Sequence, residues 1–138
     1  MALLRTLDMF FFVFHTAWII FVLVGWVHPR TRRWHLAVTL LTVFSWLGLG
    51  YWYGWGYCPC TDWHWQVREA IGHPPHYTSY TRFLVESLLP VTISRFYVDA
   101  TTVVGLVLAT ATSILLNIRT LKDRWTTRGA AEPRASEE

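Results

Sequence analysis

Three long apolar stretches, separated by polar connections, are the main feature of the chain. They cover about residues 8–27, 34–54 and 96–118 and contain few ionisable side chains. A bilayer core of about 30 Å needs roughly 20 apolar residues in a helix that rises about 1.5 Å per residue. The pattern therefore predicts an all-α membrane protein with three transmembrane helices. The first stretch reaches Trp26, which is too long for the apolar core of a signal peptide, so we expect it to be retained.

The connection between the second and third stretches, residues 55–95, is predicted to stay at the membrane surface. Thr61 or Asp62 can cap a short interfacial helix that runs to Ile71. Its lipid-facing side comprises Trp63, Val67, Ala70 and Ile71, and its water-facing side comprises His64, Arg68 and Glu69. Segment 83–94 is about half as long as a span, so we expect it to lie in the interface or to re-enter the membrane.

The C-terminal segment 126–138 differs in character from the rest of the chain. It contains Gly, Ala, Pro, Ser and Glu without a hydrophobic period. Such composition is typical of disorder, because it offers too little apolar surface to bury. We therefore expect a single transmembrane domain over residues 1–125, followed by a disordered tail.

Composition and charge support the membrane interpretation and suggest an orientation. The chain is 53% hydrophobic and 15% charged, whereas soluble domains contain roughly 25% charged residues. Arg and Lys gather at residues 30–33 and 119–134. Because short cytoplasmic loops are rich in these residues, we expect both clusters in the cytoplasm and the N-terminus and cysteine-containing loop outside. The net charge of +3 needs only an anionic leaflet as its partner, and no nucleic-acid-binding pattern is present.

Each predicted span carries a stripe of polar or small residues on one helical face. In chain order the stripes are Asp8, His15, Trp18, Val22 and Gly25; His35, Thr39, Thr42 and Ser45; and Thr101, Gly105, Ala109, Ser113 and Asn117. Small residues let helices approach closely in lipid, where packing and interhelical hydrogen bonds drive association. We therefore expect Gly105 and Ala109 to lie at a helix–helix contact. Gly105→Leu should disrupt that contact, whereas Leu106→Ile should not.

Two histidines lie in the predicted spans, and each has more than one interpretation. An ionisable residue inside a span usually faces the bundle interior and finds a partner there. His15 is therefore either a neutral histidine hydrogen-bonded to another helix or a ligand of a cofactor. His35 lies beside Trp34 at the opposite boundary, and we interpret it as an interfacial anchor. The two differ in depth by roughly 15 Å, which excludes a shared metal ion or haem iron.

Both cysteines lie in the loop, in the sequence Cys58-Pro59-Cys60. This spacing differs from the Cys-x-x-Cys of zinc ribbons and thioredoxin-like sites, and a disulfide across it would be strained. Asp62 and His64 can complete a set of four metal ligands with the two cysteines. The alternative is a shaped turn in front of the short helix.

The loop is also predicted to cover the outer end of the first span. A pocket closed by the loop tryptophans should gather His15, Cys58, Asp62, His64 and Arg68. In this pocket Arg68 is expected to pair with Asp8 or Glu86, because an ion pair offsets the cost of a carboxylate at the membrane boundary.

Several motifs follow one another in a defined order over about residues 7–118. They are His15 in an aromatic first span ending in Gly25, the start Trp34-His35-Leu36 of the second span, the motif Gly-Tyr-Cys-Pro-Cys-Thr at its exit, and Arg68. This combination resembles a bacterial membrane family catalogued as domain of unknown function 2784. Typical members have Leu in place of Cys60 and Pro-Leu-Glu in place of residues 62–64, and many have a histidine near position 86 or 87. The resemblance implies a small bacterial inner-membrane protein without an assigned activity.

Two classes of function remain open. The first is a non-enzymatic accessory or assembly subunit, which binds other membrane proteins or a second copy of itself. The alternative is a redox protein in which His15, with His64 or another loop residue, holds haem b or a transition metal. Membrane haem sites usually use two histidines on facing helices at matching depth, and the spans offer no clean second histidine. This favours the non-enzymatic interpretation.

Overall fold

The computed structural model describes residues 1–74, 76–77 and 79–131, and these residues form an all-α fold. Its elements are α1 (Ala2–Val24), α2 (Arg32–Phe44), the π-helical segment η1 (Ser45–Leu49), α3 (Gly50–Tyr53), α4 (Pro59–Ala70), α5 (Tyr80–Leu88) and α6 (Arg95–Ala131). Three helical stretches are long and apolar enough to cross a membrane: Ala2–Val24, Arg32–Tyr53 and Arg95–Thr127. The predicted fold class is therefore confirmed.

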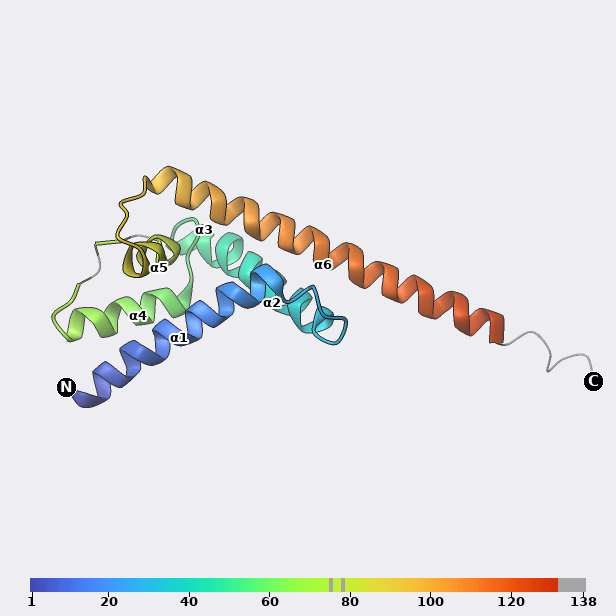
Figure 1. Cartoon of the computed structure of the whole chain (residues 1–138), viewed down its shortest axis with the longest axis horizontal. Coiled ribbons are helices and arrows are strands. Elements are labelled where there is room, and N and C mark those ends of the chain that lie inside the picture. The colour runs from blue at the N-terminus through green and yellow to red at the C-terminus, as the bar shows by residue number, and fades with distance from the viewer. Residues whose placement is uncertain (75, 78, 132–138) are drawn as a thin grey trace, which may run out of the picture.

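The three long helices form a bundle with one crowded end. α1 and α2 run in opposite directions, and α6 lies along α2 and extends well beyond it at the C-terminal end (Figure 1). The N-terminus, α4, α5 and the start of α6 gather at the other end, where α4 packs lengthwise on α1 (Figure 1). This end holds the residues that sequence analysis singles out as a site.

The polar and small stripes of the spans meet inside the bundle. Thr39 and Ser113 are fully buried. Trp18 Nε1 donates to Thr42 Oγ1 at 3.1 Å, and Asn117 Nδ2 donates to the Arg32 carbonyl at 3.1 Å. Interhelical hydrogen bonds of this kind satisfy polar groups that lipid cannot.

The apolar part of the bundle core lies between α1 and α6. The buried residues are Val22, Leu106 and Ala109, with Trp18, Val38, Val43 and Trp46 packed around them. A Cβ atom added to Gly105 would lie 3.6 Å from Leu23 Cδ2, so this glycine faces α1. Leu106 is itself a core residue, and Leu106→Ile is therefore not a neutral control for Gly105→Leu.

His35 lies in the interior, and its prediction as an interfacial anchor is wrong. The side chain is fully buried, and Nε2 lies 2.8 Å from the Val22 carbonyl oxygen. A Cβ atom at Gly25 would lie only 2.9 Å from His35 Cδ2. The missing side chain of Gly25 makes room for the imidazole, which then contacts the last turn of α1 instead of the membrane surface.

The second span ends in an irregular segment that determines where the chain goes as it enters the cysteine-containing loop. A π-helical turn, η1, interrupts the α-helical hydrogen bonding, as often happens near functional sites. The Ser45 hydroxyl donates to the Tyr57 carbonyl at 2.8 Å. The chain therefore folds back along the second span after α3, and α4 begins beside the bundle instead of away from it.

The third span is longer than its hydropathy suggests. α6 continues through Ala131, so residues 126–131, which were expected in a disordered tail, are helical. Apolar residues recur past the span, at Leu121 and Trp125, and maintain a helical period. Residues 132–138 of the expected tail lie outside the described residues.

Candidate functional site

The site is built on α4, whose start differs from the prediction. Cys58 is the N-cap residue, and Pro59 occupies the first helical position, where its fixed φ and missing N–H are well tolerated. α4 thus begins before the predicted caps Thr61 and Asp62. Because it packs along α1, its His64 and Arg68 side chains face protein. The predicted exposure to water is therefore wrong for these two residues and confirmed for Glu69.

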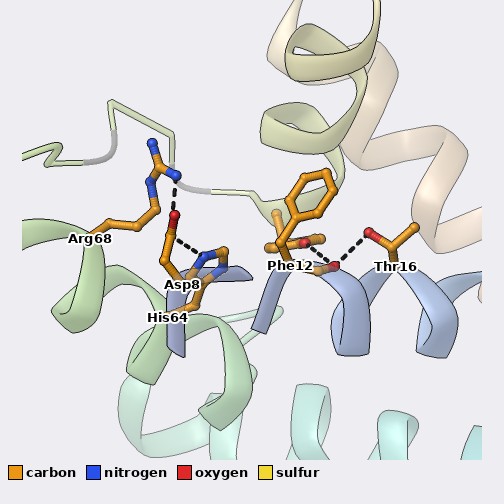
Figure 2. Close-up of polar contacts among 6 residues, drawn as sticks. Asp8, Phe12, Thr16, His64 and Arg68 are labelled. Atoms are coloured by element: carbon orange, nitrogen blue, oxygen red, sulfur yellow. Dashed lines mark hydrogen bonds and ion pairs between the residues drawn. The ribbon is translucent and has the colours of Figure 1, made fainter. Parts of the chain in front are cut away.

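Asp8 on α1 connects both of these α4 side chains. Its Oδ1 atom lies 2.8 Å from His64 Nε2 and accepts a hydrogen bond from Arg68 Nη1 at 3.3 Å (Figure 2). A carboxylate can only accept hydrogen bonds, so His64 Nε2 carries the proton of this hydrogen bond. The prediction that Arg68 pairs with Asp8 or Glu86 is confirmed for Asp8.

The three charged or polar side chains differ in their access to solvent. His64 is fully buried, whereas 26% of the Asp8 side chain and 23% of the Arg68 side chain are exposed. Burial lowers the pKa of His64 below its ordinary value, although its hydrogen bond to Asp8 acts in the opposite direction. The physical cause is that a buried imidazolium loses its hydration.

Aromatic rings surround this ion pair. The His64 ring stacks on Phe11 with 5.8 Å between centroids, and Tyr80 and Phe83 from α5 each lie 5.9 Å from it. The Arg68 guanidinium lies over the Phe83 ring, 4.8 Å from its centroid. Rings at these distances exclude water and add a cation–π contact, so the pair is stronger than one at an open surface.

His15 lies on the other side of Tyr80. It is buried, and its ring lies parallel to the Tyr80 ring with only 3.9 Å between centroids. The Tyr80 hydroxyl donates to the Phe12 carbonyl at 3.1 Å. Thr16 Oγ1 donates to the same oxygen at 2.7 Å (Figure 2). Tyr80 thereby attaches α5 to α1 and separates His15 from His64.

Sequence reasoning did not identify Tyr80 and Phe83 as part of the site. They are the two buried residues of α5. The one available signal is their spacing of three residues, which places both on one helical face. This spacing predicts that one face of the helix is buried, but not which other helix that face packs against.

Asp62 is turned away from the cluster. It accepts hydrogen bonds from Gln66 Nε2 at 3.1 Å and from the Tyr57 hydroxyl at 3.4 Å. Positions 62 and 64 are about 200° apart around a helix of 3.6 residues per turn, so they cannot share a face. Within the described part of the chain no three His, Cys, Asp or Glu residues come together as a metal site. The predicted set of Cys58, Cys60, Asp62 and His64 is therefore not assembled.

Glu86 and two of the loop tryptophans also lie outside the cluster. Glu86 pairs with Arg82 at 2.9 Å and accepts the Ile93 N–H at 3.3 Å. The Arg82 hydrogen bond lowers the pKa of Glu86 below its ordinary value. Trp55 and Trp63 are exposed, whereas the Trp65 ring lies 5.4 Å from the His64 ring and 5.2 Å from the Phe83 ring, centroid to centroid. The predicted tryptophan cover is therefore confirmed for Trp65 and wrong for Trp55 and Trp63, and α5 closes the rest of the cluster.

Comparison with known proteins adds a family but no activity. No curated protein and no solved structure matches the chain. A family model described as "Protein of Unknown function (DUF2784)" matches residues 5–118, which contain the second span, most of the first and third spans, and the whole cluster around Asp8. The chain therefore belongs to the DUF2784 family of proteins of unknown function.

Proposed function

We propose that this protein is a non-enzymatic accessory or assembly subunit of a bacterial inner-membrane complex, and that it binds another membrane protein through α6. In the proposed orientation the N-terminus and the cysteine-containing loop are outside and the C-terminus is cytoplasmic. The observation that carries the proposal is a second apolar face on α6, which no other described helix covers.

This face has the spacing of a helix-pairing seam. The residues follow one another at alternating intervals of three and four: Val104, Val107, Ala111, Ile114, Ile118, Leu121 and Trp125. All of them are exposed, whereas Leu106, Ala109 and Ser113 on the other side of α6 are buried against α1 and α2. A heptad pattern sustained over three repeats is typical of a helix that pairs with another helix.

The seam continues beyond the part of α6 that lipid would cover. Leu121 and Trp125 are 53% and 79% exposed and lie among Arg119, Lys122 and Arg124. Acyl chains can cover the apolar residues up to Ile118, but a seam that runs on into a basic segment needs a partner outside the hydrocarbon. A helix of another subunit that runs beside α6, both within the membrane and beyond it, covers the whole seam.

Site-specific photo-cross-linking in the cell tests this proposal. A photoreactive residue placed at Val107, Ile114 or Leu121 should form adducts with another membrane protein, and one at Leu106 or Ser113 should not. Adducts between two copies of the chain would instead identify self-association. Equal labelling at seam and buried positions would contradict the proposal.

A substitution in the seam provides the second test. Leu121→Asn should weaken the cross-link formed from Val107, because it places a polar group in the contact. Asp123→Asn, on a different face of the same exposed turn, is the matched control and should leave the cross-link unchanged.

The haem alternative finds partial support in two of the three buried histidines. Nδ1 of His15 and Nδ1 of His64 are buried without a hydrogen-bond partner, as free ligand atoms would be. The hydrogen bond from Nε2 of His64 to Asp8 is also compatible with a ligand role, because ligating histidines usually donate their second ring N–H to a carboxylate. However, the Tyr80 ring stacks on His15 at 3.9 Å and lies between the two imidazoles, so His15 and His64 do not face each other as a pair of haem b ligands. A Soret band in the purified protein would contradict this conclusion.

A further inference from the structure

We propose that Cys58 and Cys60 form a redox-active dithiol, which exchanges with the disulfide of a small thiol compound and becomes an intramolecular disulfide. This activity is separate from the α6 contact, and it adds a chemical role to a subunit whose main role we propose to be binding. The proposal rests on the placement, the accessibility and the chemistry of the two thiols.

The fold holds the two thiols next to each other at the start of α4. Cys58 is the N-cap residue with extended backbone, at φ −133° and ψ 117°, and Cys60 follows Pro59 in the first helical turn. Burial raises the pKa of the Cys60 thiol, and the neighbouring Cys58 thiol raises it further. The chain contains only these two cysteines, so any disulfide within one molecule must join them.

The pair is both anchored and reachable. The Ser45–Tyr57 hydrogen bond of 2.8 Å fixes the residue before Cys58 to the second span. Gly54 and Gly56 adopt positive φ angles of 104° and 78°, a conformation that favours glycine and lets the chain turn back toward α4. Both cysteines are free and partly exposed. A small disulfide can therefore approach them without unfolding the bundle.

The surroundings of the two thiols assign their roles in thiol–disulfide exchange. The thiolate is the attacking species, and burial disfavours the thiolate of Cys60. Cys58, at the N-cap and next to the exposed loop, is the attacking residue. Cys60, two residues further along in the first helical turn, is the resolving residue.

The exchange proceeds in two balanced steps. The Cys58 thiolate attacks one sulfur of the external disulfide, forms a mixed disulfide and releases the first external thiolate. The Cys60 thiolate then attacks Cys58 Sγ, forms the Cys58–Cys60 bond and releases the second external thiolate. Two electrons pass from the dithiol to the external disulfide, and the two thiol protons end on the released thiols or in solvent.

The short spacing makes the product an exchangeable disulfide rather than a structural one. A disulfide across a single proline closes a small ring and departs from relaxed geometry, and strained disulfides are more easily reduced. The pair should therefore cycle between its two states near the redox poise of a thiol buffer. In the proposed orientation it faces the compartment where disulfides form.

Redox titration of the purified full-length protein tests the inference. The protein in detergent is equilibrated with glutathione buffers of increasing oxidised fraction, quenched with acid and alkylated, and its mass is measured. Wild-type protein should lose both reactive thiols together, with the loss of two hydrogen atoms and no retained glutathione. Dithiothreitol should restore both thiols.

The single-cysteine variants distinguish exchange from simple modification. Cys58→Ser and Cys60→Ser each lack one partner, so each should retain one glutathione and form no internal disulfide, with Cys58 reacting faster. Wild-type protein that retains two glutathiones, or that stays reduced in the most oxidised buffer, would overturn the proposal. Because this assay involves neither α6 nor an intact membrane, its failure would leave the proposed subunit role untouched.

Discussion

Replacing Asp8 with alanine should reveal how strongly the ion pair attaches α4 to α1. The substitution removes the one carboxylate that both His64 and Arg68 contact, at 2.8 and 3.3 Å. It leaves the fully buried His64 without a partner for Nε2 and leaves Arg68 unpaired beneath the Phe83 ring. The neutral variant Asp8→Asn keeps an acceptor for His64 but loses the charge that Arg68 pairs with.

The expected loss follows from the burial of the three side chains. Exposed ion pairs contribute about 0–1 kcal/mol, whereas breaking a buried pair costs about 3–5 kcal/mol. About a quarter of the Asp8 and Arg68 side chains is exposed, so solvent screening reduces the buried value. A buried donor without an acceptor costs about 1–3 kcal/mol. We expect Asp8→Ala to lower the free energy of unfolding by about 3 kcal/mol and Asp8→Asn by about 1–2 kcal/mol.

Reversible unfolding in mixed micelles, with SDS as denaturant and tryptophan fluorescence as the signal, measures this loss. Asp99→Ala is a matched control, because Asp99 pairs with Arg95 at 3.2 Å within one helix while both side chains are largely exposed, at 40% and 63%. The control should cost less than about 1 kcal/mol. Equal losses for Asp8→Ala and Asp99→Ala would refute the argument that burial strengthens the α1–α4 pair.

Three further predictions concern packing, pH dependence and orientation. Gly25→Ala should destabilise the bundle by about 1–3 kcal/mol in the same unfolding assay, because the new Cβ would lie 2.9 Å from His35 Cδ2. Gly105→Ala is the control and should be tolerated, because its new Cβ would lie 3.6 Å from the nearest atom, Leu23 Cδ2. Burial lowers the pKa of His64 in the fold, so unfolded chains bind protons more readily, and stability should fall as the pH drops below about 6.5, with a weaker dependence in His64→Gln. A membrane-impermeant thiol reagent added to intact cells after mild reduction should label Cys58, whereas labelling only after the membrane is opened would reverse the orientation.

Local sequence patterns predict the transmembrane part of this protein well. Lipid requires long apolar helices, and polar side chains within them have only the bundle interior in which to find partners. Thr39 and Ser113 were therefore recognisable as inward-facing from helical spacing alone, and the structure buries both. The later end of α6 was missed because hydropathy reports where lipid contact stops, and a helix can continue beyond that point.

The arrangement of the cluster depends instead on which segments pack together. Helical spacing shows that Asp62 and His64 lie on different sides of α4, but either side could face protein. α1 presents Asp8 to the His64 side, and Asp62 is left with hydrogen bonds to Tyr57 and Gln66. A polar side chain is buried where another segment supplies its hydrogen-bond partner. When that partner lies far away in the chain, no local pattern records the contact, and only the tertiary structure can place it.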